Sequence, residues 1–145
     1  MQKNFFRNKR GYAMSYTAML MAVVGLPMLT LTSEITRMLF VDVHLQAAVD
    51  AACAAASQAV DVPYFILTGE VVIDANVAAG NAQREFDATV AQAGINQYSP
   101  ALSGLSIVDN TKVFCDANAV MTWMVPGIAP VNLSASSAAE ARARR

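Results

Sequence analysis

The chain has 145 residues, a formal net charge of −1 and a hydrophobic content of 55%. After a membrane segment is set aside, about 85 residues from Asp61 onward remain for a compact body, too few for a large enzyme. The charge is segregated, because residues 1–11 hold four bases and no acid, whereas residues 12–139 hold ten acids and three bases. An acidic middle argues against nucleic-acid binding, which requires a basic face to neutralise phosphates.

The first predicted element is an apolar run between Arg10 and Glu34, with 23 residues that are neither acidic nor basic. As a helix it would measure roughly 34 Å, enough to cross a hydrocarbon core of about 30 Å. A signal peptide is the alternative, but its apolar region is usually about 7 to 15 residues and ends at a small-x-small site. This run is longer and continues as TSEITRMLF. We therefore predict an uncleaved transmembrane helix over residues 12–33.

The charges that flank the run predict its orientation. By the positive-inside rule, residues 1–11 form a basic segment in the cytoplasm, and the chain after about Ser33 lies outside. Lipid is then one expected partner of the chain.

Pro27 interrupts the backbone donors of the run, so we expect the helix to kink or loosen around residues 23–25, a defect that membrane helices tolerate. Ala18 and Ala22 form a small-xxx-small pair that could let another helix approach closely, although alanine is so common here that the pair is a weak signal. We expect Ala18, Ala22 and Pro27 to contact lipid or a partner helix.

The helix is predicted to continue beyond the membrane, because neither Gly nor Pro occurs between Glu34 and Pro63. Apolar residues recur there at three- and four-residue steps, which predicts an amphipathic extension of the same helix over residues 34–60. Its second half is rich in alanine, and so narrow a face would let a sheet or another helix pack close to the backbone. Glu34 and Arg37 are spaced for an i,i+3 ion pair at the membrane exit.

Residues 61–145 are predicted to form a small extracytoplasmic domain. Residues 61–73 are β-rich in composition but interrupted by Pro63 and Gly69, so we expect a connection that could hold a short strand. Three antiparallel strands are predicted in LSGLSIVD, TKVFCDANAVMTWMV and APVNLSASSAAEA, which are separated by DN and PGIAP.

A second helix is predicted over residues 75–93. Asp74 offers an N-cap, Gly94 offers the residue after the last turn, and an apolar stripe lies between them. The fold class is therefore α+β, with the alanine face of the long helix packed on one side of the sheet.

The histidine and the two cysteines are the candidate base and thiols. His44 and Cys53 are nine residues apart, which places them on opposite faces of a helix, so no dyad forms within that element. Cys53 and Cys115 have no CxxC spacing, which argues against a structural metal site. If both face the core in an oxidising envelope, they could form a disulfide, and two buried free thiols are the alternative. We expect no catalytic residue, no cofactor and no metal.

The turn MTWMVPGIAP is more apolar than a solvent loop should be. Its alternate residues could face the core of the small domain. Alternatively Trp123, Met124 and Ile128 rest on the bilayer surface or on a partner, where the amphipathic ring of Trp is favoured. The C-terminal arginines, Arg142, Arg144 and Arg145, are expected to be a solvated tail, with lipid headgroup contact as the alternative.

The N-terminal segment resembles the TadE/TadG-like proteins of Flp (tight adherence) pilus biogenesis. Their pattern is Arg-Gly before an apolar run with a central proline, then an arginine, then an LQ-A-A-DAA-A-A motif. The resemblance covers residues 10–60 well and residues 105–141 loosely, where VPGIAPVNLSASSAAEAR is similar to the final strand of those proteins. The residues that match the N-terminal pattern in order are Arg10, Gly11, Pro27, Arg37, Leu45, Gln46, Ala47, Ala48, Asp50, Ala51 and Ala52.

The resemblance implies a single-pass, pilin-like structural component of the bacterial inner (cytoplasmic) membrane that contacts other transmembrane helices or pilus subunits and has no catalytic activity. The chain departs from prepilins of this class, which carry Glu-Tyr where Tyr16 and Thr17 stand here. It also has no DxSxS motif, so the metal-dependent adhesion domain of longer members is not expected. The alternative function is that of an accessory structural subunit of a larger respiratory or photosynthetic membrane complex.

Overall fold

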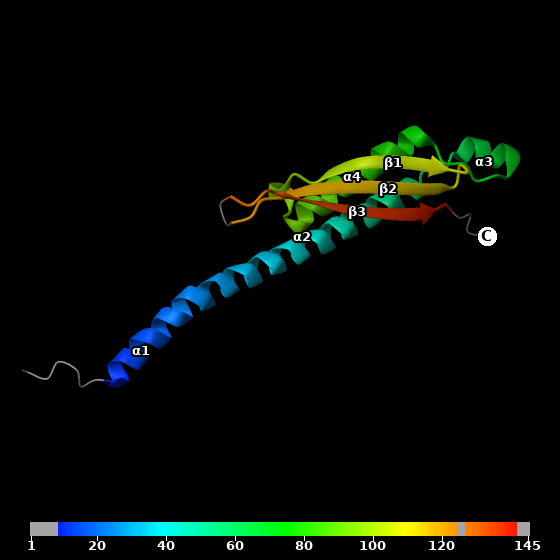
Figure 1. The fold of residues 1–145 in the computed structure, drawn as a ribbon. Coiled ribbons are helices and arrows are strands. Elements are labelled where there is room, and N and C mark those ends of the chain that lie inside the picture. The colour runs from blue at the N-terminus through cyan, green and yellow to red at the C-terminus, as the bar shows by residue number, and fades with distance from the viewer. Residues whose placement is uncertain (1–8, 125–126, 142–145) are drawn as a thin grey trace, which may run out of the picture. The chain divides into compact units, whose positions relative to one another are not determined.

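A long N-terminal helix leads into a small domain of helices and one sheet in the computed structural model, which describes residues 9–124 and 127–141 (Figure 1). The chain divides into two compact units, Met1–Arg37 and Met38–Arg145. The predicted α+β class is confirmed, because the long helix packs against a second helix and a three-stranded antiparallel sheet.

The long helix consists of α1 (Lys9–Leu20), a π-helical turn (Met21–Gly25) and α2 (Leu26–Ser57) without an intervening loop. The π turn lies where Pro27 was expected to loosen the helix. Proline has no N–H to donate, and its ring crowds the carbonyl four residues earlier, that of Val23. One wide turn moves the carbonyls away from this ring without ending the helix. The prediction of a single helix with a local defect is therefore confirmed.

The sheet has the order β1-β2-β3, with β1 at Ala101–Val108, β2 at Lys112–Met121 and β3 at Val131–Glu140. The three predicted strands are confirmed. The turn between β1 and β2 contains Asp109 and Asn110 at φ of 54° and 58°, a left-handed conformation that these two residue types tolerate. Strand β2 alternates between exposed and buried residues along its whole length, so one face of the sheet is covered and the other is open.

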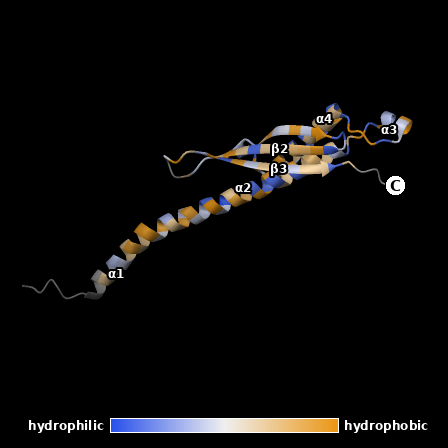
Figure 2. Cartoon of the chain, turned by 45° about the vertical axis from the view of Figure 1, so that its right-hand side comes forward, coloured by the Kyte–Doolittle hydropathy of each residue, from blue (hydrophilic) through white to orange (hydrophobic). Residues whose placement is uncertain are grey.

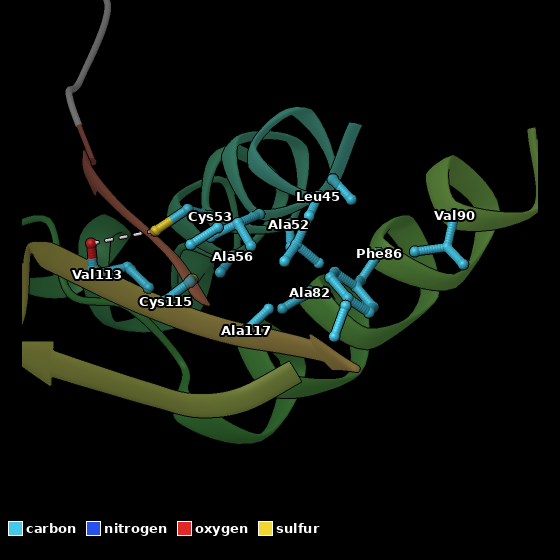
Figure 3. Packing of buried hydrophobic residues seen from close by; sticks show 14 of the residues in the cluster. Leu45, Ala52, Cys53, Ala56, Ala82, Phe86, Val90, Val113, Cys115 and Ala117 are labelled. Atoms are coloured by element: carbon cyan, nitrogen blue, oxygen red, sulfur yellow. Dashed lines mark hydrogen bonds between the residues drawn. The ribbon is translucent and has the colours of Figure 1, made fainter. Parts of the chain in front are cut away.

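The covered face carries α2 and α4 (Ala75–Ala93), whose side chains meet those of β2 (Figure 3). Helix α4 has the predicted bounds. The Asp74 carboxylate accepts from the N–H groups of Asn76 and Val77, and Gly94 ends the helix at φ 70°. The fully buried residues of the two helices include Val41, Leu45, Ala48, Val49, Ala52, Cys53 and Ala56 on α2 and Ala78 and Ala82 on α4.

The segment after α2 differs from the prediction of a connection with a short strand. It forms a helix, α3 (Val62–Thr68), and its β structure is limited to the isolated bridge between Val60 and Ile73. Asp61 caps the helix by accepting from the Tyr64 N–H, and Gly69 ends it at φ 76°. These local capping signals outweigh the β-rich composition of the segment. A short 3-10 helix, Asn96–Tyr98, then connects α4 to β1.

Candidate functional site

The candidate site is the apolar helix itself. Within the described residues, one helix is long and apolar enough to cross a membrane, Ala13–Ser57 (Figure 2). Membrane anchors and signal sequences share this property. Between residues 13 and 33 every residue is exposed except the half-buried Gly25. The large apolar side chains exposed there are Met14, Met19, Leu20, Met21, Val23, Val24, Leu26, Met28, Leu29 and Leu31. An apolar surface of this extent is suited to lipid rather than to water.

The threonine hydroxyls of this helix are satisfied by its own backbone. The Thr17 hydroxyl donates to the Ala13 carbonyl, that of Thr30 to the Pro27 carbonyl and that of Thr32 to the Met28 carbonyl. Each donor–acceptor distance is 2.8 Å. A hydroxyl without a partner in hydrocarbon would be costly, so this back-bonding removes an obstacle to burial in lipid. These hydroxyls therefore need no second helix.

The predicted contact residues of the helix are exposed, and Ala18 lies in a shallow surface groove. Ala22 and Pro27 are exposed farther along the helix and do not line that groove. Contact of all three with lipid or a partner helix stays a prediction. The groove is lined by Ala13, Met14, Thr17, Ala18 and Met21.

The expected ion pair at the end of the apolar run is present. Arg37 Nη1 lies 3.6 Å from Glu34 Oε2, one turn away on the same helix. The Glu34 side chain is only 3% exposed, and a buried carboxylate needs a nearby cation to offset its lost hydration. The pair thus neutralises the first acidic residue after the apolar run.

The two cysteines meet in the core as free, buried thiols. The Cys53 thiol donates to the Val113 carbonyl at 3.3 Å and lies 3.5 Å from the Ser137 carbonyl oxygen (Figure 3). Burial, followed by a hydrogen bond with the Cys53 thiol, strongly raises the pKa of Cys115. Both cysteines therefore face the helix–sheet core, and the disulfide between them stays a prediction.

The apolar turn after β2 is only partly within the described residues, because residues 125–126 lie outside them. Trp123 is half-buried, and within the described part of the chain its buried indole N–H has no hydrogen-bond partner. Met124 is 70% exposed and Ile128 51% exposed. Their contact with a bilayer or a partner stays a prediction. The three C-terminal arginines also lie outside the described residues.

His44 is half-buried on α2, where its ring packs edge-on against Phe40 with centroids 4.3 Å apart. Across residues 9–124 and 127–141, no group of three or more His, Cys, Asp and Glu side chains is placed to hold a metal ion.

Two features of the domain were not predicted from the sequence: the exposed apolar side chains of α3 and a hydrogen bond between α2 and β3. Helix α3 exposes large apolar side chains, among them Ile66 and Leu67. The Gln46 side-chain amide donates both to Asp50 on its own helix and to the Ser136 carbonyl on β3. The capping residues Asp61 and Gly69 could have indicated α3, whereas nothing in the local sequence indicates a bond across 90 residues.

Comparison with known proteins adds no relative: no family model matches the sequence, and neither curated proteins nor solved structures give a match. The likeness to TadE/TadG-like proteins therefore depends on the order of residues described above.

The state of the two thiols can be read by mass. We predict that an oxidising envelope joins Cys53 and Cys115, which are free thiols in the structure. The protein isolated from its cells without reductant and denatured in the presence of an alkylating agent should then gain no alkyl group. Reduction before alkylation should add two alkyl groups. Two groups added without prior reduction would contradict the disulfide.

The reduced protein should lose stability at high pH. Because its pKa is raised in the fold, Cys115 keeps its proton while the unfolded chain releases it above about pH 8.5. The Cys115 thiol therefore makes its full contribution to the free energy of unfolding below that pH. Above it, this contribution falls by up to about 1.4 kcal/mol for each pH unit. Urea unfolding measured from pH 7 to 10 should show this decline in the free energy of unfolding. The decline should be less steep in the Cys115→Ala protein. If the free energies of unfolding of the two proteins fell in parallel with pH, the decline could not be assigned to Cys115.

Proposed function

We propose that the protein is a membrane-anchored, pilin-like structural component of Flp/Tad-type pilus biogenesis that acts by helix packing rather than catalysis. The observation that carries this proposal is the continuity of α2. The helix begins in the exposed apolar run and continues, without a break, into the domain, where one of its faces is buried in the core. A chain built in this way supports an anchor that is also an assembly element.

The proposed location is the inner membrane of a bacterium, with the basic N-terminus in the cytoplasm and the domain outside. The basic residues that precede the apolar run and the acidic residues that follow it favour this orientation. Retention of the anchor is favoured because a cut within α2 would fall in the helix that also supplies Val41 and Leu45 to the core.

The proposed assembly contact within the membrane is the groove around Ala18. Helices in lipid gain little from the hydrophobic effect and associate instead by close van der Waals packing at small residues. The Thr17 hydroxyl already donates to the Ala13 carbonyl of the same helix, so the partner needs only a complementary apolar surface. Lipid would occupy the groove when no partner helix is present.

The contact is tested by enlarging one small residue. Ala18→Leu should fill the groove and reduce recovery of the partner about tenfold, corresponding to a loss of about 1.4 kcal/mol. Met28→Leu, at an exposed residue of the same helix, should leave recovery unchanged. The measurement is quantitative mass spectrometry of complexes purified in mild detergent.

The identity of the recovered proteins tests the assignment to pilus biogenesis. We expect pilin or a secretion ATPase. Recovery with cofactor-bearing respiratory or photosynthetic subunits would overturn the pilus assignment and favour an accessory structural subunit. Equal recovery of the Ala18→Leu protein would exclude the groove as the contact.

A further inference from the structure

The third strand presents an open edge. Strand β3 is terminal in the sheet, and its ten residues pair with β2 in an unbroken register. Strand β1, at the other edge, has a register irregularity between Leu102 and Gly104 and lies beside α4. Natural proteins blunt sheet edges with such bulges, with proline or with lysine. Strand β3 contains no proline, no lysine and no bulge.

The direction of the backbone groups along β3 follows from one hydrogen bond at the end of the ladder. The Ala141 N–H donates to the Thr111 carbonyl at 2.7 Å, so alternate residues before it also face β2. The residues between them, Asn132, Ser134, Ser136, Ala138 and Glu140, direct their N–H and C=O groups away from the sheet. All five side chains are exposed, and the first four are small and uncharged, whereas Glu140 at the end of the strand is acidic.

An acidic side chain stands beside this edge. The Gln46 amide nitrogen lies 3.1 Å from the Ser136 carbonyl oxygen and 3.0 Å from Asp50 Oδ1, so it links the carboxylate to the middle of β3. The unit that contains this edge is also acidic by composition: residues 38–145 hold ten acids and five bases, three of which are the C-terminal arginines. A cationic segment is therefore favoured at this edge over an anionic one.

We propose that the free edge of β3 binds an extended segment of a second protein, which adds as a fourth strand and places a Lys or Arg side chain beside Asp50. Strand addition supplies main-chain hydrogen bonds from the outward N–H and C=O groups. In the free protein the Gln46 amide donates to both the Ser136 carbonyl and Asp50. When the strand binds, Gln46 gives up its hydrogen bond to Ser136 and keeps the one to Asp50.

A second copy of this chain fits the edge less well. Antiparallel pairing of two β3 strands about Ser136 would bring the two Asp50 carboxylates together.

The test uses the full chain in detergent micelles and a blocked nine-residue peptide in which valine alternates with threonine around a central lysine. A matched peptide carries glutamate in place of lysine. We expect the lysine peptide to bind at least tenfold more tightly, by fluorescence anisotropy, and to slow amide hydrogen exchange at Ser134 and Ala138. Asp50→Asn, which keeps an acceptor for Gln46, should abolish the preference for lysine.

Ser134→Pro isolates the edge itself. It removes an outward N–H without removing a bond to β2, and edge strands tolerate such a proline. Binding should be lost in Ser134→Pro and retained in Ser134→Ala. If the proline variant does not fold, as judged by circular dichroism, a lysine peptide N-methylated at alternate residues replaces it and should fail to bind the natural sequence.

Several outcomes would overturn the proposal: equal binding of the two peptides, protection outside β3, unchanged binding after loss of the Ser134 N–H or after N-methylation, or a stable dimer of the peptide-free protein through β3. None of these outcomes depends on the contact at Ala18. Failure at the edge is therefore distinguishable from failure of the proposed function.

Discussion

Close packing of the alanine-rich face of α2 against the sheet is the interaction on which the domain depends. Ala48, Ala52 and Ala56 on the helix and Ala117 and Ala119 on β2 are all buried. Small side chains at these positions let a helix and a sheet pack close together, and Figure 3 shows Ala52, Ala56 and Ala117 in the space between α2 and β2. Dispersion contacts are individually weak but accumulate where backbones approach in this way. The same approach brings the Cys53 thiol to the Val113 carbonyl and the Gln46 amide to β3.

The long helix is built for two surroundings. Up to residue 33 its apolar side chains are exposed and its threonine hydroxyls bond their own backbone, both of which suit lipid. Beyond the Glu34–Arg37 pair, one stripe of the helix is buried in the domain while Asp42 and Asp50 remain exposed. A change in side-chain pattern, without a break in the backbone, thus separates the proposed anchor from the part of α2 that packs in the domain.

Local signals explain what could be predicted from the sequence. Helix α4 was predicted with its observed bounds because Asp74 and Gly94 cap a periodic apolar stripe, and the strands were predicted because turn residues separate alternating segments. Helix α3 was missed because valine, isoleucine and phenylalanine favour strands by composition, although Asp61 and Gly69 cap a helix there. The placement of Asp50 beside β3 could not be predicted, since it depends on the hydrogen bond of Gln46 to Ser136, 90 positions away in the sequence.

The central claim is that the small-residue face of α2 must lie close to the sheet, and the most direct test is the stability of two matched variants. Ala52 is fully buried and Ala54, on the same helix, is exposed. Ala52→Leu should lower the free energy of unfolding by about 1 to 3 kcal/mol through overpacking, and Ala54→Leu by about 0.5 kcal/mol or less. Equal stabilities of the two variants in chemical denaturation would contradict the account.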